Sequence, residues 1–187
     1  LSITSVAADD GSNAILWSSG DGGEYLSGVF YGIDVYSITP NGVGGFSVNS
    51  TGGFMDLYLT NNLINANQGT GGYINDADGI AHNDYNGITN TGSLFLSLEW
   101  TSGVDPLDSN VTIDGDFDTL SLPSTGDAAG FLNVTGGSHA AMFDSNGLPT
   151  AFGNVDLFAQ NNFCTNGVVG CAFPAQGNWD LLSEDPV

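Results

Sequence analysis

Apolar and polar residues alternate along much of the chain, which is the pattern of a half-buried β-strand. The clearest run is residues 94–101, where Leu94, Leu96, Leu98 and Trp100 share one face. Residues 54–60 repeat the pattern, with apolar side chains at alternate positions. Both segments therefore predict strands with one face toward a core.

Shorter alternating runs, separated by Gly- and Asn-rich turns, extend over the rest of the chain. They predict further strands at residues 1–7, 14–18, 25–31, 33–39, 45–49, 111–113, 117–122, 130–135 and 154–160. One short helix is expected at residues 138–143, capped by Ser138. Long polar insertions occur at about residues 61–90 and 136–153. We expect a single domain over residues 1–187, an antiparallel all-β sandwich or jelly roll with long Gly/Asn-rich loops.

The charge balance excludes several partners. The chain has no Lys and no Arg against 21 Asp and Glu, a formal net charge of −21. Nucleic-acid binding and attachment to anionic membranes both need cations, so neither is expected. No stretch reaches the roughly 20 apolar residues of a membrane helix, so we expect no transmembrane segment. Only 11% of residues are charged, and the surface must be mostly Asn, Ser, Thr and Gly.

Two cysteines, Cys164 and Cys171, flank a short segment that contains an Asn-Gly turn signal. This spacing predicts a disulfide, with two free buried thiols as the alternative. A short bridge favours an oxidising compartment. The chain starts at Leu1 and not at Met, which indicates processing. We therefore expect an extracellular or cell-surface protein whose signal peptide has been removed.

Clusters of Asp and Asn suggest calcium as a structural cofactor. Ca²⁺ binds six to eight hard oxygens, which carboxylates, amides and turn carbonyls supply. Neither cluster follows the spacing of an EF-hand loop, and solvated turn residues are the alternative reading. The candidate ligands are Asp105, Asp108, Asn110, Asp114, Asp116 and Asp118 in one cluster, and Asp76, Asp78 and Asp84 in the other.

Other chemistry is weakly supported. Tyr73 and Tyr85 lie in the polar insertion and are candidate glycan contacts, since aromatic rings stack on sugars. Ser138, His139 and Asp144 contain the residue types of a catalytic triad, but neighbouring residues rarely face each other as a triad requires. A glycosidase would need paired carboxylates, and only three Glu are present. We therefore predict no enzyme activity.

The amino-terminal segment is a candidate assembly strand. Leu1, Ile3 and Val6 belong to a short, β-prone stretch without charged side chains, and the Asp- and Gly-containing residues 7–12 could serve as a hinge. Such a strand can complete its own sheet or pair with the edge of a neighbouring copy. A head-to-tail exchange would produce an open filament.

Residues 130–147, Gly-Phe-Leu-Asn-Val-Thr-Gly-Gly-Ser-His-Ala-Ala-Met-Phe-Asp-Ser-Asn-Gly, are followed by Asn-Val-Asp-Leu-Phe at residues 154–158. This segment resembles exported bacterial PEP-CTERM proteins of the flocculation-associated type. The resemblance implies a surface or matrix protein of a biofilm or floc, with no catalytic residues to carry over. The family's sorting tail, Pro-Glu-Pro followed by an apolar stretch and Arg, is absent, which is the expected result if that tail has been removed.

The sequence thus favours a non-enzymatic extracellular structural protein of the bacterial cell surface or biofilm matrix, which polymerises by strand donation. The alternative is a secreted carbohydrate-binding module or adhesin that recognises extracellular polysaccharide. A small secreted glycoside hydrolase is a distant third.

Overall fold

The structure is a computed structural model that describes residues 2–3, 5–7, 14–61, 92–120, 124–165 and 181–184. Twelve strands form most of this part of the chain: β1 (Ser2–Ile3), β2 (Ser5–Ala7), β3 (Ile15–Ser18), β4 (Tyr25–Pro40), β5 (Phe46–Thr60), β6 (Ser93–Thr101), β7 (Ile113–Phe117), β8 (Thr125–Gly136), β9 (Leu148–Thr150), β10 (Gly153–Val155), β11 (Leu157–Thr165) and β12 (Leu181–Glu184).

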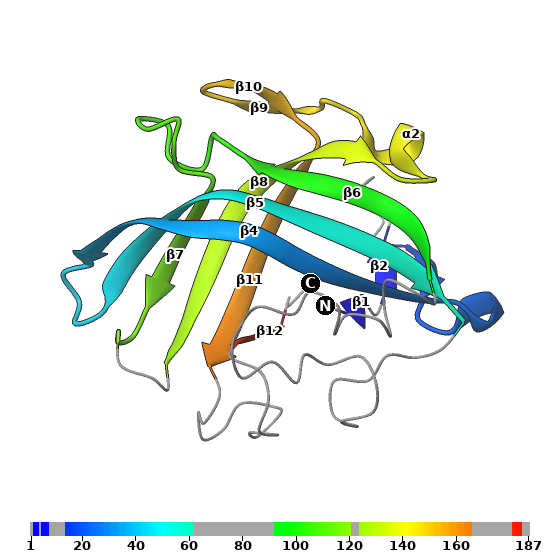
Figure 1. The fold of residues 1–187 in the computed structure, drawn as a ribbon, viewed down its shortest axis with the longest axis horizontal. Coiled ribbons are helices and arrows are strands. Elements are labelled where there is room, and N and C mark those ends of the chain that lie inside the picture. The colour runs from blue at the N-terminus through cyan, green and yellow to red at the C-terminus, as the bar shows by residue number, and fades with distance from the viewer. Residues whose placement is uncertain are drawn as a thin grey trace.

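Eight strands form one antiparallel sheet, in the order β1-β4-β5-β6-β8-β11-β12, with β7 paired to β5 and β8. β7 and β6 pair with successive parts of β5 and β8, so they occupy the same position between these two long strands. The sheet is strongly curled. In Figure 1 the strands β4, β5 and β6 run roughly horizontally, whereas β7 and β11 run at a steep angle to these three strands. The expected all-β, sandwich-like antiparallel fold is confirmed.

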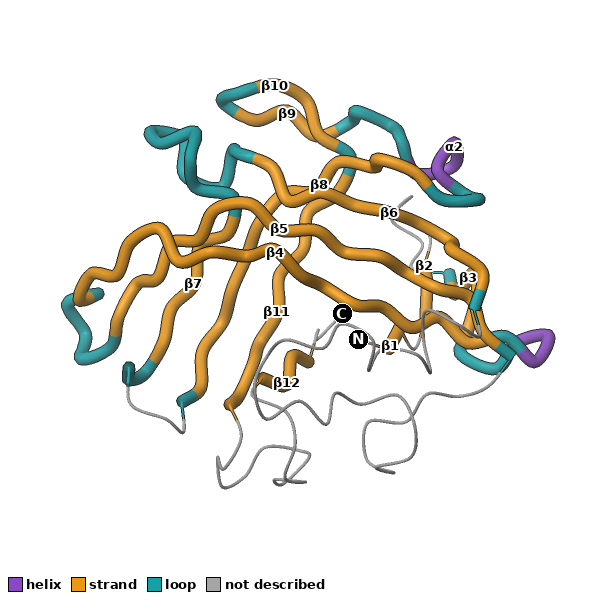
Figure 2. The backbone as a smooth tube through the Cα atoms, in the orientation of Figure 1, coloured by secondary structure: helices purple, strands orange, loops and turns teal. Residues whose placement is uncertain are grey.

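Two small hairpins and one short α-helix complete the described fold. β2 pairs with β3, and β9 pairs with β10. The helix α2 (Ala140–Phe143) confirms the helix predicted here, and a single 3₁₀ turn, η1 (Asp21–Gly23), precedes β4. Figure 2 shows α2 and the β9–β10 hairpin on the same side of β6. The predicted cap is wrong, because Ser138 Oγ bonds the Leu94 carbonyl and no side chain caps α2.

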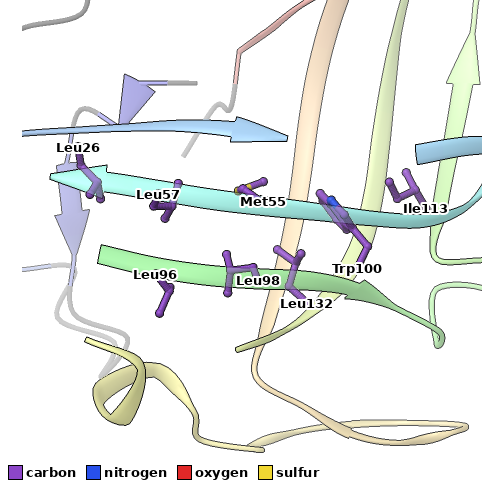
Figure 3. Packing of buried hydrophobic residues seen from close by; sticks show 8 residues of the cluster. All are labelled: Leu26, Met55, Leu57, Leu96, Leu98, Trp100, Ile113 and Leu132. Atoms are coloured by element: carbon purple, nitrogen blue, oxygen red, sulfur yellow. The ribbon is translucent and has the colours of Figure 1, made fainter. Parts of the chain in front are cut away.

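The core lies on one face of the curled sheet. Leu96, Leu98 and Trp100 of β6 are buried, as are Met55 and Leu57 of β5, which confirms the alternation predicted for both strands. Figure 3 shows them together with the side chains of Leu26, Ile113 and Leu132. Leu94 departs from the pattern and is 38% exposed. A bulge between Leu57 and Tyr58 shifts the β5–β6 register there, which explains the departure.

Trp100 occupies the centre of this core, and glycines make room for it. A Cβ on Gly53 would lie 2.6 Å from Trp100 Cδ1, and one on Gly130 would lie 2.8 Å from Trp100 Cε3. Any larger residue at either position would overlap the indole ring. These two glycines therefore fix how closely β5 and β8 approach the ring.

Several strand boundaries differ from the sequence prediction. The strand predicted at residues 154–160 is divided between β10 and β11, and β9 lies within the segment predicted as a polar insertion. Residues 25–31 and 33–39 form the single strand β4: Gly32 has a φ of +71°, yet the pairing with β5 keeps its register from Tyr31 to Ile33, and the irregularity lies between Val35 and Ser37. Residues 45–49 and 54–60 likewise merge into β5. The predicted strands at 111–113 and 117–122 are largely wrong, since β7 covers Ile113–Phe117 between them. Pairing with β5 and β8 on both sides makes this Asp- and Gly-rich segment extended.

Candidate functional site: the outer face and open edge of the sheet

The sheet face opposite the core, here called the outer face, carries aromatic and acidic side chains that could contact a partner. Tyr31, Phe54, Glu99 and Asn133 are successive register partners across β4, β5, β6 and β8. A second row joins Thr101, Phe131 and Phe158 across β6, β8 and β11. Cross-strand neighbours lie about 5 Å apart and side chains alternate between faces, so each row projects as one line.

Aromatic rings form two pairs on this face. The rings of Tyr31 and Phe54 are stacked with centroids 5.5 Å apart, and those of Phe131 and Phe158 lie 5.1 Å apart. Tyr31, Phe54 and Phe158 are exposed. The outer face therefore displays aromatic surface to solvent at two places on either side of Glu99.

Asp56 connects the first aromatic pair to the polar network. The Tyr31 hydroxyl donates to Asp56 Oδ2 at 3.2 Å, and Ser97 Oγ donates to Asp56 Oδ1 at 2.6 Å. Burial raises the pKa of the Tyr31 hydroxyl, and the Asp56 carboxylate raises it further. The same two causes raise the pKa of Tyr58. Both phenols thus stay protonated and able to donate hydrogen bonds well into the alkaline range.

An acidic ladder lies further along the outer face. It consists of Asp114 and Asp116 on β7 with Asp127 on β8, where Asp116 and Asp127 are direct register partners. Like charges in direct opposition destabilise a sheet. Burial raises the pKa of Asp114, and the Asp116 carboxylate raises it further, against the hydrogen bond from Ser47. The negative charges of this ladder therefore lower the stability of the folded sheet.

The other predicted calcium ligands of this cluster serve turns. Asp108 accepts the backbone N–H and the side-chain amide of Asn110, which hold its pKa below the ordinary value. Asp105 accepts the N–H of Leu107. In the described part of the chain, no group of three or more His, Cys, Asp or Glu side chains is arranged to hold a metal ion. A calcium site stays a prediction.

Asp118 closes the end of the β7–β8 pair. It accepts hydrogen bonds from Ser124 Oγ at 2.6 Å and from Thr125 N at 2.9 Å. The Ser124 bond, followed by the Thr125 bond, lowers the pKa of Asp118. Hydrogen bonds from the chain itself therefore account for the position of the Asp118 carboxylate, without a metal ion.

Several predicted residues fall outside the described part of the chain. These are Asp76, Asp78, Asp84, Tyr73, Tyr85, Cys171 and Leu1. Cys164 lies in β11, opposite Leu182 of β12, but its side chain is not described. The second calcium cluster, the glycan contacts and the disulfide accordingly stay predictions.

His139 and Ser138 contact each other near α2, with Ser138 Oγ 2.9 Å from His139 Nδ1. The imidazole stacks on Phe95 at a centroid distance of 4.3 Å. Asp144 accepts instead from the Asn146 side chain. The three residues do not form the relay that a catalytic triad requires.

The amino-terminal segment lies on the edge of the sheet. Ser2 and Ile3 of β1 pair with Ser27 and Leu26 of β4, and β2 pairs with β3, so Ile3 and Val6 are both in strands of the same chain. β1 covers two of the sixteen residues of β4. Beyond Ser27, no described strand pairs with this side of β4.

The open part of β4 is apolar. Ile33, Val35, Tyr36 and Ile38 are exposed, and Asp34 is the one charged residue between Val29 and Pro40. Sequence reasoning missed this edge because alternation reveals a strand but not its position in a sheet. It also missed the aromatic pairs, whose members are far apart in the chain and meet only through strand register.

The chain matches no known protein family, no curated protein sequence and no solved structure in the comparisons made with it. We also find, over the described residues, no helix with the length and hydropathy needed to cross a bilayer.

Proposed function

We propose that this protein is a non-enzymatic extracellular structural protein of the bacterial surface or biofilm matrix, and that it self-associates through the β4 edge. The observation that carries this proposal is the long, apolar and nearly uncharged open edge of β4. Proteins that stay monomeric usually protect such an edge with charge, Lys especially, or cover it. This chain has no Lys. Its neutral Asn, Ser and Thr surface and its predicted disulfide favour an extracellular setting.

Strand donation explains how an open polymer could grow from this edge. Among the described residues β1 pairs with β4 through Ser2 and Ile3, so exchange of this pairing for the same segment of another copy breaks few hydrogen bonds. A donated strand would gain affinity from main-chain hydrogen bonds to β4. Because donor and acceptor are different surfaces, the contact repeats head to tail.

Positive charges introduced on β4 test whether its open edge mediates self-association. In the variant Val35→Lys/Ile38→Lys, two ammonium groups would have to be desolvated when a strand pairs with β4, so we expect assembly to weaken by tenfold or more, an effect of about 1.4 kcal/mol. Light scattering after size-exclusion chromatography and negative-stain electron microscopy measure it. The control Val43→Lys/Leu107→Lys makes the same charge change at two exposed positions off the edge and should assemble as the unmodified chain does. A full chain that stays monomeric up to its solubility limit would disprove the proposal.

Strand donation has a separate test. Deletion of residues 1–6 removes the donor and leaves the β4 edge in place, so the truncated protein should lose filament growth. Polymerisation of the truncated protein at the rate of the full chain would mean that the edge pairs with some other strand.

A further inference from the structure

We propose that the outer face also binds an uncharged polysaccharide chain, on the two aromatic pairs Tyr31–Phe54 and Phe131–Phe158 and the polar row between them. The proposal is independent of self-association: Tyr31 belongs to β4, but its side chain and the other three project from the sheet face, whereas self-association uses the main-chain groups along the β4 edge. All four rings lie on the face opposite the core, as the strand register requires.

The aromatic surface is available to a ligand. Phe54 is 40% exposed and Phe158 is 50% exposed. Gly32 lies beneath Phe54, since a Cβ at that position would be 3.3 Å from Phe54 Cδ2. The missing side chain leaves the Phe54 ring room to lie against β4, with its other side toward solvent. Aromatic faces of this kind attract the partly positive C–H groups of a sugar ring.

Hydrogen-bond acceptors lie between the two pairs. Glu99 pairs in register with Phe54 on one side and with Asn133 on the other. Its exposed carboxylate has no hydrogen-bond partner among the described residues, and Asn133 Oδ1 is buried without one. A buried acceptor without a partner is uncommon in folded proteins. Of the two groups, the exposed Glu99 carboxylate is the one that a ligand can reach, and it accepts hydrogen bonds of the kind that sugar hydroxyls donate.

The combination favours a neutral polysaccharide over other partners. An anionic polymer would be repelled by a chain of charge −21 without Lys or Arg. An apolar protein segment would cover the rings but would remove water from the Glu99 carboxylate without replacing its hydrogen bonds, at a cost. A sugar chain offers apolar ring faces and hydroxyl donors in a repeating order. Phe54 and Phe131 are separated by two strand intervals and by two residues along the strand, roughly 12 Å in all, so a chain lying obliquely across the strands would contact both.

Depletion binding to insoluble polysaccharides tests the proposal. The full chain is mixed with cellulose, chitin, xylan and β-1,3-glucan, which are uncharged, and with chitosan and alginate as cationic and anionic references, in buffer with added salt. We expect saturable binding to at least one uncharged polymer. Phe54→Ala and Phe158→Ala should each weaken it by about fivefold, and Glu99→Gln should weaken it as well. Leu107→Ala, an exposed apolar residue off this face, should bind as the unmodified chain does.

Three outcomes would overturn the proposal. These are no binding to any uncharged polymer, binding to chitosan alone, or equal binding by the control and by Phe54→Ala, Phe158→Ala and Glu99→Gln. The edge variant Val35→Lys/Ile38→Lys is measured in parallel. It should keep its polysaccharide binding whether or not it assembles, so a failure here is distinct from a failure of the self-association proposal.

Discussion

Asp114 and Asp118 lie close together in sequence, yet their surroundings shift their pKa values in opposite directions. Asp118 receives hydrogen bonds that stabilise its charge, whereas burial and the neighbouring Asp116 disfavour the charge of Asp114. The chain has no Lys or Arg whose charge could offset the cost at Asp114. Individual carboxylates therefore contribute to stability with opposite signs.

We predict that Asp114→Asn stabilises the fold at neutral pH. A raised folded-state pKa means that ionised Asp114 destabilises the folded protein above that pKa, and that the cost disappears as the pH falls through it toward the unfolded value. The gain from Asn should therefore shrink at acidic pH. Denaturant unfolding at a series of pH values measures it. The control Asp34→Asn removes the same charge from an exposed position, and an equal, pH-independent gain in both variants would contradict the prediction.

At the scale of elements, β8 contains a tight position and an open one on the same strand. A Cβ at Gly130 would lie 2.5 Å from the Thr112 carbonyl oxygen as well as against Trp100, while one at Gly136 would meet nothing closer than 3.9 Å. Neither glycine has a positive φ, so the two differ in packing and not in backbone conformation. This difference shows where β8 is held against the core.

We predict that Gly130→Ala destabilises the fold by about 1–3 kcal/mol, because the new methyl group must displace Trp100 or the backbone at Thr112. Gly136→Ala should be neutral or slightly stabilising, because it only reduces the freedom of the unfolded chain. Chemical denaturation and the near-ultraviolet circular dichroism of the aromatic side chains, Trp100 among them, measure both effects. Equal stability of the two variants would mean that the centre of the core is less tightly packed than the structure indicates.

At the scale of the whole molecule, the charge of −21 must be balanced from outside. Ion pairs with Asp and Glu can involve only His or the chain's amino terminus. Repulsion between carboxylates opposes compaction, and the acidic ladder on β7 and β8 concentrates it. Ions that gather near this surface should therefore stabilise the fold.

We predict that millimolar Ca²⁺ raises the melting temperature by more than NaCl of equal ionic strength, since an ion that binds the folded state alone stabilises it increasingly as the free ion concentration exceeds its Kd. Differential scanning calorimetry of the full chain, with and without chelator, provides the comparison. Equal shifts in the two salts would show that screening alone acts on the carboxylates.

Much of the fold could be predicted from the sequence, since burial on one side of a strand imposes a period of two. The alternation in residues 54–60 and 94–101 identified the core faces of β5 and β6, including the buried Trp100. The all-β class and the one short helix followed from the same patterns. The candidate site was anticipated less well, because acidic clusters in sequence resemble ligand sets whether they bind an ion or close a turn.

The tertiary structure alone decided which strands are neighbours. It placed Tyr31 beside Phe54 and Phe131 beside Phe158, made a strand of Ile113–Phe117, and left most of one side of β4 without a partner among the described strands. Asp and Gly disfavour strands by themselves, so β7 needs its partners on both sides. The composition and alternation of this chain determined that it forms sheets with one buried face. The aromatic pairs of the outer face and the open edge of β4 depend on strand order and register, which are set by contacts between residues distant in sequence.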